Sequence, residues 1–138
     1  MVLVDTSVWS LALRRPAHRL SEVERRHVHE WTGLVRRGEA ALIGVVRQDL
    51  LTGIRDFAAF QRLRVALRSF PDERLTTEDF EDAARADNLC RVAGLSGSGV
   101  DYLLCAAALR HGMPIYATDR DFERYAEHLP LRLHQPAP

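Results

Sequence analysis

The chain has 138 residues, of which 46% are hydrophobic and 28% are charged, and its formal net charge at pH 7 is zero. This length and composition predict one folded domain and exclude a disordered chain. No apolar run reaches the roughly 18 residues that a membrane-spanning helix needs, so we expect a cytoplasmic protein without membrane contact. All 19 basic residues are arginine. The absence of lysine excludes a phosphate-binding loop and Schiff-base chemistry, which both depend on a lysine amine.

Hydrophobic periodicity predicts an alternation of short apolar strands and amphipathic helices. In chain order the predicted elements are strand 2–4, helix 8–13, helix 22–37, strand 40–43, a helix from about 46, helix 57–70, a single strand candidate at Leu75, helix 77–93, helix 100–111, strand 114–117, helix 119–127 and strand 131–133. Ser21 and Glu24 form a capping-box pattern before the second helix, and Thr77 is the predicted cap of helix 77–93. Strands that alternate with helices predict a parallel sheet covered on both faces.

Four aspartates are predicted to gather at one edge of this sheet. Asp5 ends the first strand and Asp119 follows the strand at 114–117, so both lie at the carboxyl edge, where parallel α/β sheets bind their ligands. Asp101 and Asp49 lie near the starts of two helices that can point at the same edge. Each acid alone is also a common helix cap or turn former, which is the alternative interpretation. Asp101 departs from it because an almost entirely apolar helix follows, and a carboxylate near a core needs a cation or several donors.

A group of carboxylates in a chain without lysine favours a divalent metal site. Mg²⁺ and Mn²⁺ prefer carboxylate and water oxygens, and such a metal can activate water for phosphodiester hydrolysis. The six histidines show no metal-ligand spacing, and we expect them to be surface or structural residues. Cys90 and Cys105 lie inside predicted helices and are expected to be buried thiols rather than a disulfide.

Charge is divided between the two halves of the chain. Residues 1–74 hold 13 arginines against 9 acids, and residues 75–138 hold 6 arginines against 10 acids. A basic half beside an acidic one can form a nucleic-acid groove next to a metal site, because the arginine fork binds phosphate. Ordinary solvated helices give charge excesses of the same size, so both interpretations stay open.

Four segments together resemble the PIN-domain ribonucleases, in particular the VapC toxins of toxin-antitoxin pairs. They are 3–9 (LVDTSVW), 48–53 (QDLLTG), 100–107 (VDYLLCAA) and 117–122 (ATDRDF). The resemblance implies an α/β fold, a three-layer α/β/α sandwich with a central parallel sheet of four or five short strands, with the PIN domain over residues 1–134 and a disordered tail over 135–138. It also implies an endoribonuclease that uses Mg²⁺ or Mn²⁺ to cut structured RNA such as tRNA or rRNA, a homodimer, and a cognate VapB-type antitoxin as partner.

The resemblance also assigns roles to single residues. Asp5, Asp101 and Asp119 correspond to the metal ligands, and they are catalytic together with Asp49, which stands where the family usually has Glu. Because the Asp49 side chain is one methylene shorter, weaker activity or an altered metal preference is expected. The accessory residues are Ser7, Thr118 and Asp121, and the candidate RNA-phosphate contacts are Arg47, Arg55, Arg62, Arg64, Arg68 and Arg120.

Three other functions compete with this one. A phosphoacceptor receiver domain needs a late lysine and two adjacent early acids, whereas the chain has no lysine and Thr6 follows Asp5. A haloacid-dehalogenase-like phosphatase needs Asp-x-Asp after the first strand, and Ser7 stands at the position of the second acid. A non-catalytic PIN-like module that binds RNA or a partner is favoured only by Asp49. The metal-dependent ribonuclease is therefore the preferred interpretation.

Overall fold

Val2–Val4 forms β1, a buried strand at the centre of the sheet in the computed structural model, which describes residues 1–138. The strand order is β2-β1-β3, and both pairings are parallel. β2 covers Ala40–Ala41, β3 covers Ile115–Tyr116, and Leu3 of β1 pairs with a residue of each. Because both neighbours run parallel to β1, the carboxyl ends of all three strands meet at one edge of the sheet.

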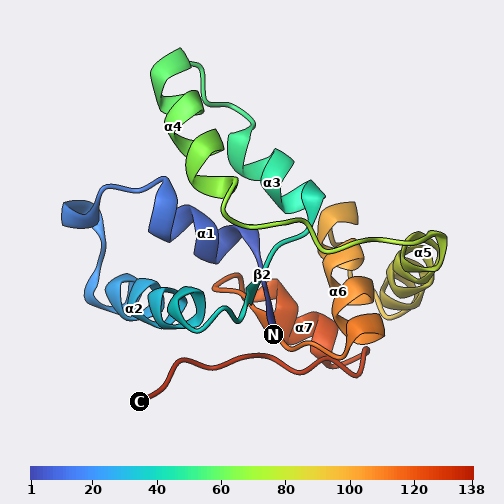
Figure 1. The fold of residues 1–138 in the computed structure, drawn as a ribbon. Helices are drawn as coiled ribbons and strands as arrows, with labels where there is room; N and C mark the ends of the chain where they lie inside the picture. The colour runs from blue at the N-terminus through green and yellow to red at the C-terminus, as the bar shows by residue number, and fades with distance from the viewer.

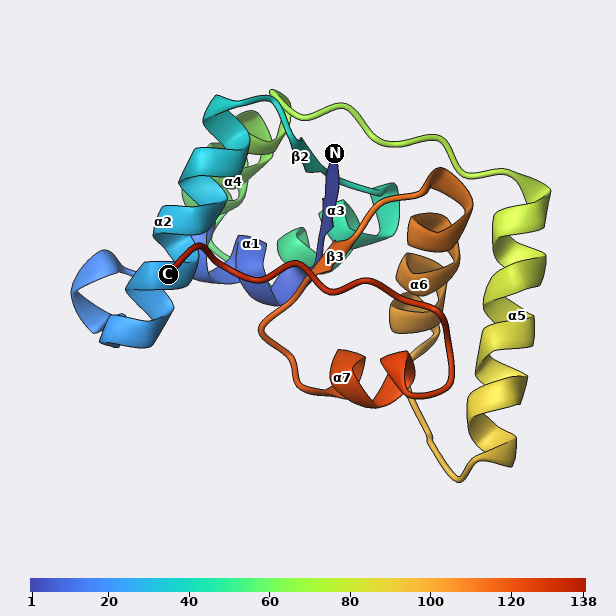
Figure 2. The same ribbon diagram turned by 90° about the horizontal axis from the view of Figure 1, so that it is seen from below.

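Seven α-helices surround this sheet (Figure 1). They are α1 (Thr6–Leu13), α2 (Glu22–Arg36), α3 (Gly44–Leu51), α4 (Phe57–Leu67), α5 (Thr77–Val92), α6 (Gly99–His111) and α7 (Asp121–Ala126), and a 3-10 turn covers Ala17–Arg19. α1 and α2 lie on one side of the sheet and α5 and α6 on the other, while α3 and α4 project as a helical pair (Figures 1 and 2). The predicted α/β class is confirmed. None of the helices combines the length and the apolar character needed to cross a bilayer.

The sheet has three strands rather than the expected four or five. At each edge a further segment of the chain pairs with it at one residue only, which is too short a pairing to form a strand. Ile115 is bridged to the end of the segment predicted as strand 131–133. Only Ile115 exchanges backbone hydrogen bonds with that segment, through its N–H and its carbonyl, so no strand forms there. At the opposite edge Leu42 is bridged to Asp72, whereas the strand candidate Leu75 forms no bridge.

Several helix boundaries also differ from the prediction. α1 begins at Thr6 rather than at residue 8, and α7 begins at Asp121 rather than at residue 119. α3 begins at Gly44 rather than near residue 46. Ile43 is therefore the N-cap residue of this helix, so the preceding strand is shorter than predicted. Thr76, and not Thr77, caps α5 through a capping box with Asp79. The predicted capping box before α2 is present.

Trp9 fixes α1 against the end of β1. Its ring is fully buried and makes edge-to-face contacts with Trp31 and Phe70, at centroid distances of 5.5 and 4.9 Å. The indole N–H donates to the carbonyl of Val4 at 3.1 Å. Asp5, the first residue after β1, therefore lies between a buried strand and a buried aromatic cluster.

α5 and α6 pack along each other on one flank of the molecule (Figure 2). Cys90 of α5 and Cys105 of α6 are buried free thiols, as predicted. Asp79, near the start of α5, is fully buried, and one of its oxygens accepts the N–H of Thr76 at 2.7 Å. The other lies 3.1 Å from Nε of Arg110 near the end of α6, as an ion pair without hydrogen-bond alignment. One carboxylate therefore both caps α5 and attaches it to α6.

Replacement of Asp79 by alanine removes the capping box and the partner of Arg110, so we expect the free energy of unfolding to fall by about 2–3 kcal/mol. The loss stays below that of a completely buried pair because the Arg110 side chain is 38% exposed and water can solvate it. Urea denaturation followed by circular dichroism measures the change. Asp82→Ala is the matched control, because its carboxylate lies 3.8 Å from Arg110 and is partly exposed; it should lose less than about 1 kcal/mol. Equal losses in the two variants would contradict the anchoring role of Asp79.

Candidate active site

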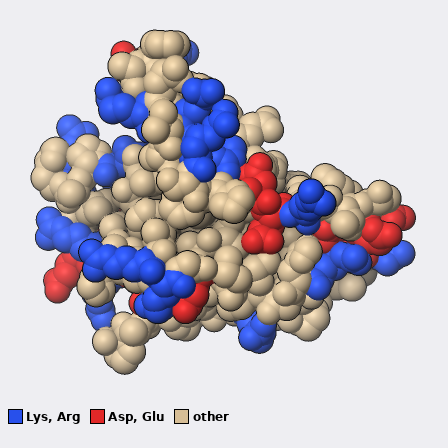
Figure 3. All heavy atoms as spheres, viewed as in Figure 1, with Lys and Arg blue, Asp and Glu red and all other residues tan.

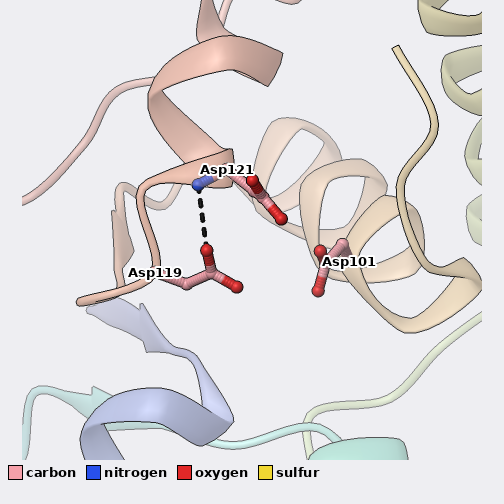
Figure 4. Close-up of side chains that lie close together, drawn as sticks. All are labelled: Asp101, Asp119 and Asp121. Atoms are coloured by element: carbon pink, nitrogen blue, oxygen red, sulfur yellow. Dashed lines mark hydrogen bonds between the residues drawn. The ribbon is translucent and has the colours of Figure 1, made fainter.

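Three aspartates meet beyond the carboxyl edge of the sheet. Asp101, Asp119 and Asp121 each offer a carboxylate oxygen, and these oxygens lie within 4.8 Å of one another. Figure 4 shows the three side chains directed toward a common space. Asp101 lies in the first turn of α6, Asp119 follows β3, and Asp121 begins α7 and donates its backbone N–H to Asp119 Oδ1 at 2.9 Å. We call these three residues the acid cluster; it unites two of the predicted catalytic acids with Asp121, which was expected to be accessory.

Asp5 borders the acid cluster without being part of it. It lies directly after β1 and is only 5% exposed. Its Oδ2 accepts hydrogen bonds from the N–H and the hydroxyl of Ser7, at 3.0 and 2.6 Å, so it also caps α1. The Ser7 hydroxyl in turn accepts the N–H of Thr118 at 3.0 Å and joins the loops that follow β1 and β3. Burial raises the pKa of Asp5, and the charge of the nearby Asp101 raises it further.

The acid cluster is electrostatically crowded. Burial raises the pKa of Asp101, and the charges of Asp119 and Asp121 raise it further. The one ion pair in the cluster is long and exposed, with Arg124 Nη1 at 3.9 Å from Asp121 Oδ1. A divalent cation relieves such repulsion, and Mg²⁺ or Mn²⁺ binds oxygen ligands of this kind while keeping several waters. The donor set therefore fits a divalent metal.

Tyr125 of α7 supports the cluster from its buried side. Its hydroxyl donates to Asp101 Oδ2 at 2.7 Å, and its ring packs against that of Tyr102 at a centroid distance of 5.1 Å. A side chain at position 97 would collide with both tyrosine hydroxyls, so Gly97 lets the loop before α6 close over them. Sequence reasoning missed Tyr125, because its contact with Asp101 spans 24 positions and a tyrosine on a short helix ordinarily indicates core packing.

Asp49 lies outside the acid cluster. It is the sixth residue of α3, in the second half of the helix rather than near its start, and it is exposed. None of its carboxylate oxygens belongs to the group that could share a metal ion. The structure thus brings Asp101 and Asp119 together, sets Asp5 beside them, and leaves Asp49 as a separate acid.

The six candidate arginines divide by their contacts. Arg47 Nε donates to Asp72 Oδ1 at 2.9 Å, and its other nitrogens donate to the carbonyls of Leu67 and Phe70, so it fastens the end of α4 to the following linker. Figure 3 shows basic side chains gathered over α4, next to a patch of acidic ones. The exposed candidates are Arg55, Arg62, Arg64, Arg68 and Arg120. Sequence patterns alone could not separate Arg47 from these five, because its contacts are tertiary.

The sequence matches the family model described as PIN domain over residues 2–128. VapC ribonuclease Mb1587 of Mycobacterium bovis is 29% identical over 130 residues, which cover 89% of this chain and 90% of the relative. Ribonuclease VapC11 of Mycobacterium tuberculosis shows the same identity and coverage.

Solved structures share the fold at low sequence identity. FitAcB from Neisseria gonorrhoeae superposes with a TM-score of 0.74 at 18% identity and covers 99% of this chain and 98% of its own. VapBC2 from Rickettsia felis, bound to a DNA fragment from their promoter, gives a TM-score of 0.74 at 15% identity and covers 97% and 98%. These likenesses extend the agreement in fold to almost every residue of the chain.

Removal of the Tyr125 hydroxyl should weaken metal binding. Tyr125→Phe leaves Asp101 Oδ2 without its donor while the ring packing stays, and loss of such a supporting hydrogen bond weakens metal affinity by about tenfold or more. Calorimetric titration of the purified protein with Mn²⁺ measures the affinity. Tyr102→Phe is the matched control, because the Tyr102 hydroxyl is buried and forms no hydrogen bond, to Asp101 or to any other group. Unchanged Mn²⁺ affinity in Tyr125→Phe would show that the tyrosine serves packing alone.

Proposed function

Because this chain belongs to the PIN domain family, we propose that it is a metal-dependent endoribonuclease, the toxin of a toxin-antitoxin pair. The observation that carries the proposal is the acid cluster, with three carboxylate oxygens within 4.8 Å at the carboxyl edge of the sheet and Asp5 beside them. Relatives that align over nine-tenths of their length are named ribonucleases, which supports RNA as the substrate class.

The proposed chemistry is hydrolysis of a phosphodiester bond in structured RNA such as tRNA or rRNA. When bound, a divalent ion such as Mg²⁺ or Mn²⁺ would supply an activated water and neutralise charge on the phosphate. Asp101, Asp119 and Asp121 would hold this ion, and Asp5 adds negative charge at the border of the site. Tyr125 fixes the orientation of Asp101. The exposed arginines bind RNA phosphates in this proposal, without reading sequence.

The partner that we propose is a VapB-type antitoxin, and the proposed assembly is a homodimer in the cytoplasm. Support comes from a similar solved structure, VapBC2, which is bound to a DNA fragment from their promoter, and from FitAB, which is bound to an IR36 DNA fragment. The exposed apolar residues of α4, Phe57 and Val65, offer a surface on which a partner can pack.

Cleavage of RNA should depend on both the metal and Asp101. Purified protein is incubated with total RNA and Mg²⁺ or Mn²⁺, and new 5′ ends are mapped. We expect discrete cuts that EDTA abolishes and that Asp101→Asn reduces by at least about a hundredfold, because loss of one ligand charge removes both metal affinity and transition-state stabilisation. Glu127→Gln is the control, since this exposed acid of the same region forms no ion pair. Cuts that persist in Asp101→Asn would overturn the site assignment.

The Asp101→Asn substitution should make the metal-free protein more stable. The pKa of Asp101 is raised, which means that the folded state binds the Asp101 proton more tightly than the unfolded chain does. The stabilisation that comes from this proton is present at low pH and is lost as the pH rises through the folded-state pKa. Asp101→Asn removes the charge, so the melting temperature at pH 7 without metal should rise by about 2–4 °C. Added Mn²⁺ should raise the melting temperature of the wild type and leave that of the variant unchanged. A variant that melts below the wild type in the absence of metal would contradict the crowding of charge in the cluster.

Lengthening of the Asp49 side chain tests the one feature that favours a non-catalytic module. Asp49→Glu extends an exposed carboxylate of α3 by one methylene, and we expect cleavage to become about threefold to tenfold faster. Initial rates on a defined RNA measure the effect. Gln48→Glu is the matched control, because it adds the same carboxylate one position earlier and on a different side of the helix. Equal rates for all three proteins would exclude position 49 from the chemistry.

A further inference from the structure

One arginine lies at the border of the acid cluster. Nη1 of Arg124 is 3.9 Å from Oδ1 of Asp121, three positions earlier on α7. No other basic side chain forms an ion pair with a carboxylate of the cluster. Arg120, the other arginine of this segment, lines a neighbouring cavity between α2 and α7 instead. Arg124 is therefore the basic side chain that accompanies the proposed metal site.

The guanidinium group of Arg124 has its donors free. The contact with Asp121 is too long for a hydrogen bond, and no side-chain N–H of Arg124 donates to any other group of the chain. The side chain is 66% exposed, so a ligand in solvent can reach it. Arg47 shows the opposite case, because its nitrogens donate to Asp72 and to two carbonyls. Arg124 keeps the planar fork of donors with which arginine binds phosphate.

The charge of the acid cluster requires a basic group of this kind if a phosphate is to bind there. Asp101, Asp119 and Asp121 carry three negative charges when ionised, and a divalent ion would contribute two positive ones. The metal-loaded cluster would therefore remain negative, and it would repel the negative charge of a phosphodiester. The positive charge of Arg124 offsets this remaining charge at the border of the cluster.

Stabilisation of α7 alone accounts poorly for this arginine. An exposed acid and arginine three positions apart stabilise a helix only weakly, and the effect is smaller still for a pair as long as this one. α5 has the same arrangement outside the acid cluster, where Arg85 Nη1 lies 3.2 Å from Asp82 Oδ1. This second pair offers a comparison that separates a helix-stabilising contact from a phosphate contact.

From these contacts we propose that Arg124 binds the phosphate group that is cut and holds it against the metal-loaded acid cluster. Its fork would donate to the non-bridging oxygens of the phosphate, and its charge would stabilise the negative charge that builds up on these oxygens in the transition state. The proposal rests on the proposed ribonuclease function, which it deepens by naming a residue that touches the substrate.

The first test uses AMP, which has a phosphate but no internucleotide bond that could be cut. Calorimetric titration of the Mn²⁺-saturated protein gives the AMP affinity, and adenosine serves as the ligand without a phosphate. Arg124→Gln should weaken AMP binding about tenfold, as expected for loss of one hydrogen bond between charged groups, and leave adenosine binding unchanged. Arg85→Gln should bind AMP as the wild type does, because it removes the same charge from the matching pair on α5. Equal AMP affinity in the wild type and Arg124→Gln would overturn the proposal.

Titration with Mn²⁺ alone separates a phosphate contact from support of the metal site. Arg124 repels a cation, so Arg124→Gln should bind Mn²⁺ at least as tightly as the wild type. A loss of Mn²⁺ affinity as large as the loss of AMP affinity would mean that Arg124 positions Asp121, and the phosphate contact would be overturned. If the wild type binds no Mn²⁺, the proposed metal site fails, and AMP titration of the metal-free protein decides the role of Arg124.

Cleavage of a defined RNA at saturating concentration gives a second readout. Arg124→Gln should cleave at least about tenfold more slowly, and Arg124→Lys should recover part of the rate because it restores the charge without the fork. Arg85→Gln should cleave at the wild-type rate. Wild-type cleavage by Arg124→Gln would overturn the proposal and leave the ribonuclease function intact. Arg124-dependent AMP binding in a protein that cuts no RNA would overturn the ribonuclease function and retain the phosphate contact.

Discussion

Mutual repulsion of carboxylates at the edge of a parallel sheet is the constraint on which the rest of this structure depends. Asp101, Asp119 and Asp121 come from α6, the loop after β3 and α7, and their oxygens are nevertheless held within 4.8 Å. Burial of Asp101 and, to a smaller extent, the charges of Asp119 and Asp121 raise its pKa, so both disfavour the charged form of Asp101 in the folded state. A divalent cation would relieve this repulsion, so the arrangement supports the proposed metal site.

The scaffold resists this repulsion through neutral donors rather than through basic side chains. Ser7 donates twice to Asp5 and accepts from the loop after β3, and Tyr125 donates to Asp101. Hydrogen bonds to the charged form favour that form without bringing a competing cation into the site. Several arginines gather over α4, and Arg47 donates to carbonyls at the end of that helix. Arg124, which does pair with the cluster, is exposed and lies 3.9 Å from Asp121 Oδ1. The proposed metal ion would therefore meet a site whose carboxylates are oriented by neutral donors and keep most of their negative charge.

Much of the frame of this site was predictable because its signals are local. An aspartate directly after an apolar strand, a glycine after a helix and a capping box each follow from a few neighbouring residues. On that basis the sequence places Asp5 and Asp119 at one edge, and the neighbouring positions of β1 and β3 bring their loops together. The helix with Asp101 in its first turn was likewise visible from its apolar run.

The remaining features arise from contacts between distant segments, which periodicity does not encode. Tyr125 has the pattern of a core residue, yet its hydroxyl reaches Asp101 across 24 positions. Asp121 belongs to the acid cluster as the first residue of α7, which begins two residues later than predicted, and its contact with Asp101 comes from the packing of α7 beside α6. Asp49 illustrates the opposite error: α3 begins earlier than predicted, so this acid lies farther along the helix than expected.

α6 connects the chemistry of this fold to its stability. Asp101 lies at the start of this 13-residue helix and Arg110 lies near its end, where it meets the buried carboxylate of Asp79 on α5. The ion pair at one end and the buried face of the helix together hold α6 in place, and Asp101 is carried on its first turn. The same helix is buried along most of its length, and the apolar core supplies the free energy that holds Asp101 against its neighbours. Burial of the hydrophobic run that follows Asp101 thus fixes the position of this carboxylate close to Asp119 and Asp121, although their charges repel it.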